Sequence, residues 1–202
     1  VNATDSTGNW TVESVNVTDA STDPVVNATA STGNWTVTAL HTNDTETVVD
    51  ATNATGDWLL RDTTVRNATA PVTAIGTNGS WTIENVTATD VLFAAVNAST
   101  STGDWTVGNL TAENVTRGLD ATNATGNWTV RDTRVTDAGT EQSTTEGVAI
   151  AADNATGAVT LDNLRIVDTQ TDAIGADDST GNWSLQNVSI EDVQNDGTAA
   201  DD

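Results

Sequence analysis

A short motif, Thr-Gly-Asn/Asp-Trp, recurs along the whole chain and constrains its fold more than any other feature. We number each repeat from its Trp, or the residue that replaces it, as position 0. Asn78-Gly79-Ser80-Trp81 is a variant of the motif, and in Thr156-Gly157-Ala158-Val159 a Val replaces the Trp. Position 0 falls at residues 10, 35, 58, 81, 105, 128, 159 and 183, so the period is 23 to 25 residues, with one interval of 31. A fixed period of this length is typical of repeat proteins whose units stack on one another.

Alignment of the eight repeats places apolar residues at fixed positions. Position +2 is apolar and position −7 is Ala in every repeat. The pairs −9/−7, 0/+2 and +5/+7 each show the two-residue alternation of a β-strand. The pattern predicts an all-β fold, a right-handed parallel β-helix (solenoid) of about eight coils, with three short strands per coil and interior stacks of Trp, Val and Ala. The expected core stack is Trp10, Trp35, Trp58, Trp81, Trp105, Trp128 and Trp183.

Position +9 is Asp or Asn in all eight repeats. These short polar side chains bond to nearby backbone and tolerate the left-handed conformation, so the column is expected to turn a corner. The expected corner ladder consists of Asp19, Asp44, Asn67, Asp90, Asn114, Asp137, Asp168 and Asp192.

The repeats predict one β-solenoid domain over residues 1–202, interrupted by an irregular loop at 138–147. Neither end of the chain shows a polar cap, and Asn195–Ala200 has the pattern of a further corner. We therefore expect the domain to be a segment of a longer array, or to stack end to end with other copies.

The repeated segments resemble those of a known fold family. Trp-x-Val/Leu, Asn/Asp-Val/Leu-x-Val/Ile and Val/Ile-x-Ala, as in residues 183–190, are similar to right-handed parallel β-helix repeat proteins of the pectate-lyase-like and NosD-like type. The resemblance covers the whole chain. It implies the fold and leaves the function open, because that fold hosts lyases, hydrolases, tailspikes and adhesins.

The charge balance is strongly acidic, with 29 Asp and Glu against six Arg, no Lys and a formal net charge of −23. This composition resembles secreted and surface proteins of extremely halophilic archaea, where about 1 M salt screens charge repulsion to about 3 Å. A basic patch for nucleic acid or an anionic membrane is missing. No apolar run approaches the roughly 18 residues of a membrane span. We expect no nucleic-acid partner and no direct membrane insertion.

Potential N-glycosylation sequences, Asn-x-Ser/Thr, include eighteen of the twenty asparagines. Part of this count reflects Asn and Thr as common residues of solenoid turns. The acceptors we expect to be accessible are Asn2, Asn16, Asn27, Asn53, Asn97, Asn123 and Asn154. Covalent N-glycans at these residues would require an extracellular or cell-surface location.

Residues for catalysis are scarce. Lys, Tyr and Cys are absent, and His41, the single histidine, falls at the outward position +6. The carboxylates follow the repeat columns, as corner residues do, rather than forming a separate pair of the kind that glycosidases use. We expect no enzymatic activity, no catalytic residues, no cofactor and no defined metal site. Pairs such as Asp177-Asp178 and Asp201-Asp202 could bind cations diffusely.

These observations predict a structural extracellular glycoprotein module, such as a surface filament, stalk or adhesin. Its partners would be covalent N-glycans and, at its ends, further solenoid coils or other copies of the chain. The alternative is a carbohydrate-binding or carbohydrate-processing module of the tailspike type. That alternative predicts a groove on the face that bears the +9 corners.

Overall fold

The computed structural model describes residues 1–20, 23–139 and 147–194. Regular structure within these residues is entirely β-strand. A long strand begins at each position 0, and three short strands lie elsewhere in the coils. The long strands are β1 (Trp10–Thr18), β3 (Trp35–Asp50), β4 (Trp58–Thr73), β5 (Trp81–Asn97), β6 (Trp105–Asp120), β7 (Trp128–Ala138), β9 (Val159–Thr169) and β11 (Trp183–Val193); the short ones are β2 (Val26–Asn27), β8 (Ile150–Ala151) and β10 (Ile174–Gly175).

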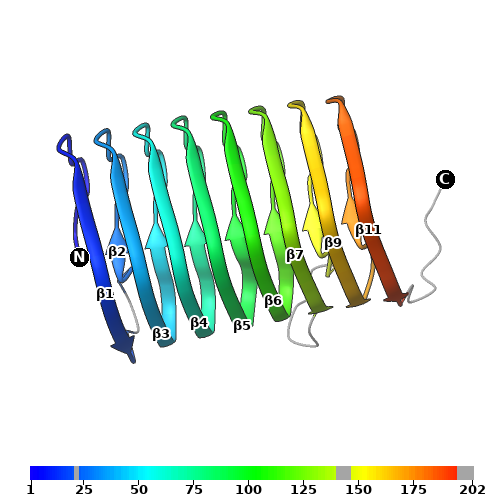
Figure 1. Cartoon of the computed structure of the whole chain (residues 1–202), viewed down its shortest axis with the longest axis horizontal. Coiled ribbons are helices and arrows are strands. Elements are labelled where there is room, and N and C mark those ends of the chain that lie inside the picture. Colours follow the sequence, from blue (N-terminus) through cyan, green and yellow to red (C-terminus); the bar gives the residue numbers. More distant parts are fainter. Residues whose placement is uncertain (21–22, 140–146, 195–202) are drawn as a thin grey trace.

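The long strands pair in parallel in the order β1-β3-β4-β5-β6-β7-β9-β11. The chain runs down the near side of the stack and returns up the far side as it advances from the first coil to the last, which is a right-handed winding (Figure 1). Eight long strands lie side by side, and seven full turns separate the first from the last. The structure therefore confirms the predicted parallel β-solenoid.

Strand pairing joins residues at the same repeat position. Trp10 pairs with Trp35, Val12 with Val37, and the same correspondence continues to the pairing of Trp183 with Val159. The register shifts on both sides of residues 92–93, where β5 has one residue more than its neighbours. Sequence columns are thus columns in space, as the alignment predicted.

Three positions in each coil, −5, +4 and +9, adopt the left-handed conformation, with φ between 49° and 65°. Positions +4 and +9 fall inside the long strands, which is why a strand of 16 residues bends twice. All eight residues at +9 have φ between 49° and 58°. Some corner side chains also bond from coil to coil: Asn114 Nδ2 donates to Asp90 Oδ1 at 2.6 Å, and Asn85 Nδ2 donates to Asp62 Oδ1 at 2.8 Å.

The interior contains the predicted tryptophan stack. Six rings, from Trp10 to Trp128, lie nearly parallel, with interplanar angles of 1° to 5° and centroids 4.8–4.9 Å apart. Trp183 departs from this pattern. Because Val159 leaves space in the coil before it, its ring lies edge-on to that of Trp128, at 5.9 Å and 80°.

Position −2 is Gly in every coil, and the structure gives the reason. A Cβ added at Gly33, Gly56 or Gly79 would lie 2.1–2.2 Å from the carbonyl oxygen of the glycine in the coil below. At Gly8, in the first coil, such a Cβ would meet nothing within 4 Å. The column therefore holds glycine because the coils approach closely here, and not because of a positive φ.

The end coils cover their apolar side chains less completely than the middle coils. Val1 is 58% exposed, and on β11 Leu185 and Ile190 are 52% and 46% exposed, although both occupy positions that face the interior in other coils. Residues 140–146 of the expected loop at 138–147, and the corner expected at Asn195–Ala200, lie outside the described residues.

Candidate functional surfaces

One surface depression, which we call the axial groove, runs along the coils and has a volume of about 970 Å³. Its walls are the outward positions −1 and +1, and position 0 lies between them. The −1 wall is Asn9, Asn34, Asp57, Ser80, Asp104, Asn127 and Ala158; the +1 wall is Thr11, Thr36, Leu59, Thr82, Thr106, Thr129 and Thr160.

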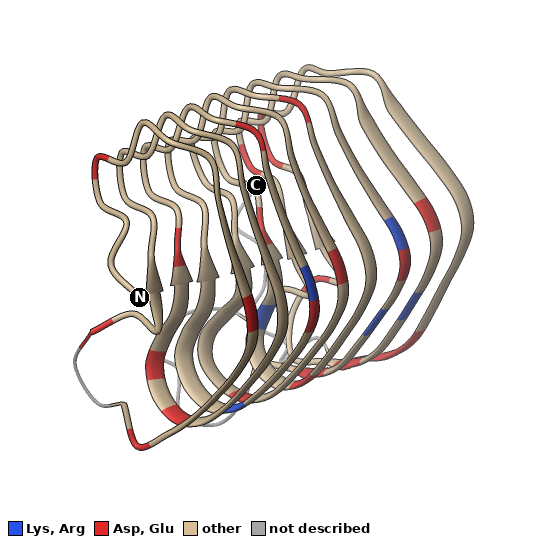
Figure 2. Ribbon diagram, turned by 60° about the vertical axis from the view of Figure 1, so that its left-hand side comes forward, with Lys and Arg blue, Asp and Glu red and all other residues tan. Residues whose placement is uncertain are grey.

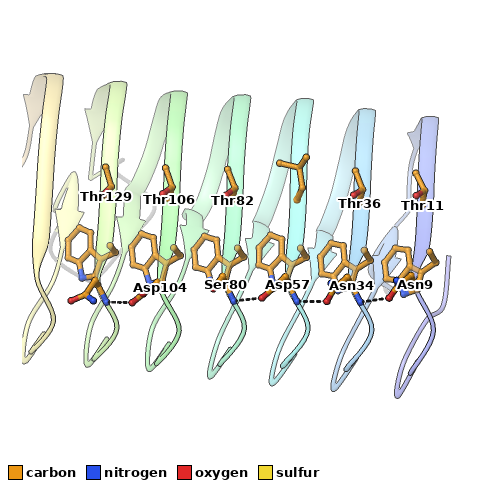
Figure 3. Close-up of a pocket in the computed structure, with 18 of the residues that line it drawn as sticks. Asn9, Thr11, Asn34, Thr36, Asp57, Ser80, Thr82, Asp104, Thr106 and Thr129 are labelled. Carbon is orange, nitrogen blue, oxygen red and sulfur yellow. Dashed lines mark hydrogen bonds between the residues drawn. The ribbon is translucent and has the colours of Figure 1, made fainter.

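Hydrogen bonds between coils fix the −1 wall. The Oδ1 atom of Asn9 accepts from the backbone N–H of Asn34 at 3.0 Å, and Asp57 Oδ1 accepts from the N–H of Ser80 at 2.9 Å. Figure 3 shows this ladder beside the tryptophan rings. Trp35, Trp58, Trp81, Trp105 and Trp128 are at most 4% exposed, so they offer no ring face to a ligand. The groove presents amide, carboxylate and hydroxyl groups in two rows, which suits a polar, elongated ligand.

The second depression, the corner hollow, encloses about 700 Å³ beside the +9 corners of β3 to β6. One wall is the +9 column and the other is the +11 column two residues later. Its lining is Asp44, Thr45, Glu46, Asn67, Ala68, Thr69, Asp90, Val91, Leu92 and Asn114. The sequence predicted a groove on this face only for the alternative of carbohydrate binding. It did not predict that an apolar residue, Leu92, lies in the +11 wall.

Three of the expected glycan acceptors, Asn53, Asn123 and Asn154, share position −5. All three are exposed and left-handed, with φ of 57° to 60°. They form what we call the crest, the row of turns along one edge of the solenoid. None makes a side-chain hydrogen bond to another described residue, so their amide groups are accessible on the surface.

The other expected acceptors differ in accessibility. Asn2 and Asn16 are exposed, and Asn27 is half-buried. Asn97 is only 8% exposed, and its Oδ1 accepts from the backbone N–H and the hydroxyl of Ser99. The expectation that Asn97 is accessible was wrong: residue 97 faces outward from its strand, yet its neighbours cover it. The alternation of strand residues could not reveal that cover.

Asparagines at the +4 and +9 corners have a different role. Asn85 and Asn109 belong to Asn-x-Thr sequences, but their Nδ2 groups donate to the corner residue of the coil below, at 2.8 Å in each case. The structure shows the ladder but leaves both residues exposed.

Charged residues are spread over the coils, with few basic groups among many acidic ones (Figure 2). Several arginines form ion pairs. Arg117 pairs with the buried Asp120 at 2.7 Å, and Arg165 pairs with Glu191 at 2.9 Å. Arg131 crosses an intervening coil to reach Glu84 at 2.7 Å, which is possible because residue 108, between them, is glycine.

Among the described residues, no group of three or more His, Asp or Glu side chains is placed to hold a metal ion. His41 and the Asp177-Asp178 pair are exposed, and Asp201-Asp202 lies outside the described ranges. In the part of the chain that the structure describes, no helix is long and apolar enough to cross a bilayer.

The fold and its surfaces define a class, the parallel β-solenoid repeat proteins. No family model, curated protein or solved structure matches the chain. A functional assignment therefore rests on the geometry alone.

Proposed function

We propose that the chain is a rigid structural module of an extracellular glycoprotein, of the surface filament, stalk or adhesin type. The observation that carries this proposal is the uninterrupted stack. Every long strand pairs with the next, and one core continues from coil to coil. Seven turns at about 4.8 Å each make a rod roughly 3–4 nm long. The proposed role is non-catalytic.

Stacking at the ends is part of the proposal. The outer strand edges of β1 and β11 lack a paired strand among the described residues, and Leu185 and Ile190 are exposed beside one of these edges. A further coil would pair with such an edge and cover the apolar side chains. That coil comes either from more repeats in the same polypeptide or from another copy of the chain.

Sedimentation and electron microscopy of the 202-residue chain test whether separate copies stack end to end. The measurements are made in about 1–3 M KCl, because repulsion between copies is screened there. We expect concentration-dependent rods. Ile190→Asp, on the interior face of β11, should abolish them, whereas Ser189→Asp, on the outward face of the same strand, should not. A monomer at every concentration would refute end-to-end assembly of separate copies. The end coils would then be covered only by further repeats of the same polypeptide.

The crest supports the glycoprotein part of the proposal, because Asn53, Asn123 and Asn154 combine an acceptor sequence with exposure. Peptide mass spectrometry of material from the native source tests it. Glycan should be present on crest peptides and absent from the peptide that contains the buried Asn97. Native protein with the mass of the bare polypeptide would refute the modification and the extracellular location inferred from it.

The finer likeness to pectate-lyase-like and NosD-like β-helices, and to surface proteins of halophilic archaea, belongs to the same proposal. It is supported by the repeat residues and by the net charge of −23. A chain adapted to salt should gain stability as KCl rises from about 0.1 to 3 M, because its self-repulsion is screened. A denaturation midpoint that does not change over this range would contradict the halophilic part.

The axial groove favours a second candidate function, the binding of a linear carbohydrate, because its two polar rows follow the long axis over successive coils. Glycan-array binding tests this candidate. Asp104→Leu would replace a polar wall residue by an apolar one and should abolish binding, and Glu113→Leu, at an exposed strand position outside the groove, serves as its control. Equal effects of the two changes would remove the groove as the binding site.

A further inference from the structure

An exposed apolar pair lies in the middle of the solenoid. Leu92 and Phe93 are 48% and 43% exposed. The other large apolar side chains exposed to this extent among the described residues are on the first and last coils: Val1, Leu185, Ile190 and Val193. Those four belong to the ends of the stack, but coil packing gives no such reason for Leu92 and Phe93. Exposed apolar groups surrounded by polar ones often mark interaction sites.

The pair lies at the point where β5 contains one extra residue. Val91 pairs with Ala68 and Val115, but beyond residues 92–93 the register has shifted by one on both sides. Such bulges turn side chains away from their regular direction. Thr116 Oγ1 donates to the carbonyl of Leu92 at 2.8 Å, which fixes the backbone of the bulge.

Phe93 is also supported from one side. The guanidinium carbon of Arg117 lies 6.0 Å from the centre of its ring, and Arg117 pairs with Asp120 at 2.7 Å. The side chain of Asp120 is only 7% exposed, so this support is anchored in the fold. The apolar pair is therefore held in place rather than carried on a long loop.

Leu92 also forms part of the wall of the corner hollow. Its column, position +11, runs Glu46, Thr69, Leu92 over three successive coils. The opposite wall carries Asp44 and Asp90, and no arginine lines the hollow among the described residues. Asn114 Nδ2 donates to Asp90 Oδ1 at 2.6 Å, and Asn67 Nδ2 donates to Asp44 Oδ1, so the carboxylates are oriented by neighbouring coils.

The hollow therefore has two chemically different ends. At the β3 end, Asp44 and Glu46 make both walls anionic, whereas at the β5 end the apolar Leu92, with Phe93 next to it in the chain, lies across the hollow from Asp90. Two coil steps of about 4.8 Å separate Glu46 from Leu92, or about 10 Å. Three residues of an extended peptide span the same distance at about 3.3 Å each.

We propose that the corner hollow docks an extended basic peptide segment of a partner protein. A Lys or Arg of that segment contacts Asp44 and Glu46, and an apolar side chain three positions away packs on Leu92 and Phe93. Charge selects the partner: a second copy of this chain, with a net charge of −23, would be repelled from an anionic hollow. This proposal is independent of the structural role proposed above.

The test uses a fluorescently labelled synthetic peptide, Ser-Lys-Lys-Thr-Leu-Phe-Ser, and the 202-residue chain, with anisotropy measured at about 0.15 M salt. One control peptide has Glu in place of both Lys, and another has Ser in place of Leu and Phe. We expect the parent peptide to bind and both control peptides to bind at least about ten-fold more weakly.

Matched protein variants separate local recognition from general attraction to an acidic chain. Asp44→Asn should weaken binding about three-fold, whereas Asp137→Asn, in the same column but outside the hollow, should leave it unchanged. Asn already occupies this column at residues 67 and 114, so both variants should fold. Leu92→Thr should weaken binding about ten-fold, and Leu59→Thr, also an outward position where neighbouring coils carry Thr, should not.

Equal losses in Asp44→Asn and Asp137→Asn would show attraction to net charge alone and overturn the proposal. Tight binding of the Ser-substituted peptide, or no binding of the parent peptide, would overturn it as well. Concentration-dependent dimers of the wild-type chain that Leu92→Thr abolishes would assign the surface to a second copy instead. Circular dichroism of each variant confirms that a lost signal is not lost folding.

Discussion

The glycine column offers a direct test of the coil packing, because the same substitution can be made with and without a coil underneath. Gly126 and Gly8 occupy position −2 in the identical sequence Thr-Gly-Asn-Trp. A Cβ at Gly126 would lie 1.9 Å from the carbonyl oxygen of Gly103, whereas a Cβ at Gly8 would meet nothing within 4 Å. Gly126→Ala and Gly8→Ala therefore differ chiefly in that contact.

The cost of Gly126→Ala follows from the geometry. Real Cβ atoms do not approach other atoms closer than 3.0 Å, so the contact must lengthen by at least 1.1 Å (3.0 − 1.9). Hydrogen bonds of 2.9–3.0 Å between these coils would then be stretched beyond bonding range, at about 1 kcal/mol each. Three such bonds lie beside the turn, so the expected loss is about 3 kcal/mol: Thr125 N to Ser101 O, Asn127 N to Asp104 Oδ1, and Trp105 N to Asn127 O.

Denaturant unfolding followed by tryptophan fluorescence measures this difference. Because solenoids can unfold in parts, amide exchange at Trp105 and Thr125 should be recorded as a local readout. We expect Gly126→Ala to lower the midpoint and speed exchange at these amides. Gly8→Ala should be neutral or slightly stabilising, because Ala restricts the unfolded chain. Equal midpoints for the two variants would refute the argument from close approach.

Three further predictions concern the core and the corners. Thr77→Val should cost about 1–3 kcal/mol and shift one indole N–H resonance, because Thr77 Oγ1 accepts the 2.9 Å hydrogen bond from Trp81 Nε1; an unchanged indole spectrum would contradict this. Thr100→Asn should raise the melting temperature by about 2–4 °C in protein from a host without N-glycosylation, since a β-branched residue at φ 58° is strained; a lower value would count against that strain. Val159→Trp should turn the ring of Trp183 parallel to the stack and strengthen the tryptophan exciton signal in circular dichroism, and no increase would show that the tilt has another cause.

Much of the fold could be predicted because each structural column is a sequence column. The Trp and Ala stacks, the parallel register and the +9 corner follow from one alignment, since stacked coils place equal positions beside each other. Thr100 shows where this approach stops. Only the structure reveals that position −5 is left-handed in every coil, because its residues include Ala and Thr as well as Asn and Asp.

The candidate surfaces were harder to predict, since they depend on side chains that differ from the repeat. Counting residues shows that the repeat beginning at Trp81 is one residue longer than the preceding one, but not that the extra residue falls beside Leu92 and Phe93 and that both are exposed. Asn97 is the opposite case, a polar residue that was expected to be accessible and is buried. Its outward position was correct in register, but neighbouring groups cover it to 8% exposure.

These departures indicate where a solenoid of this kind can acquire a specific function. Regular positions are constrained by the coils above and below, as glycine is at −2, so a change there disturbs the stack. Outward positions face solvent and can change without breaking the ladder: Gly108 lets Arg131 reach Glu84, and Leu92 gives the corner hollow an apolar end. Because such changes accumulate without loss of folding, recognition in this chain should depend on its irregular residues, and the repeat should supply the rigid frame that holds them in place.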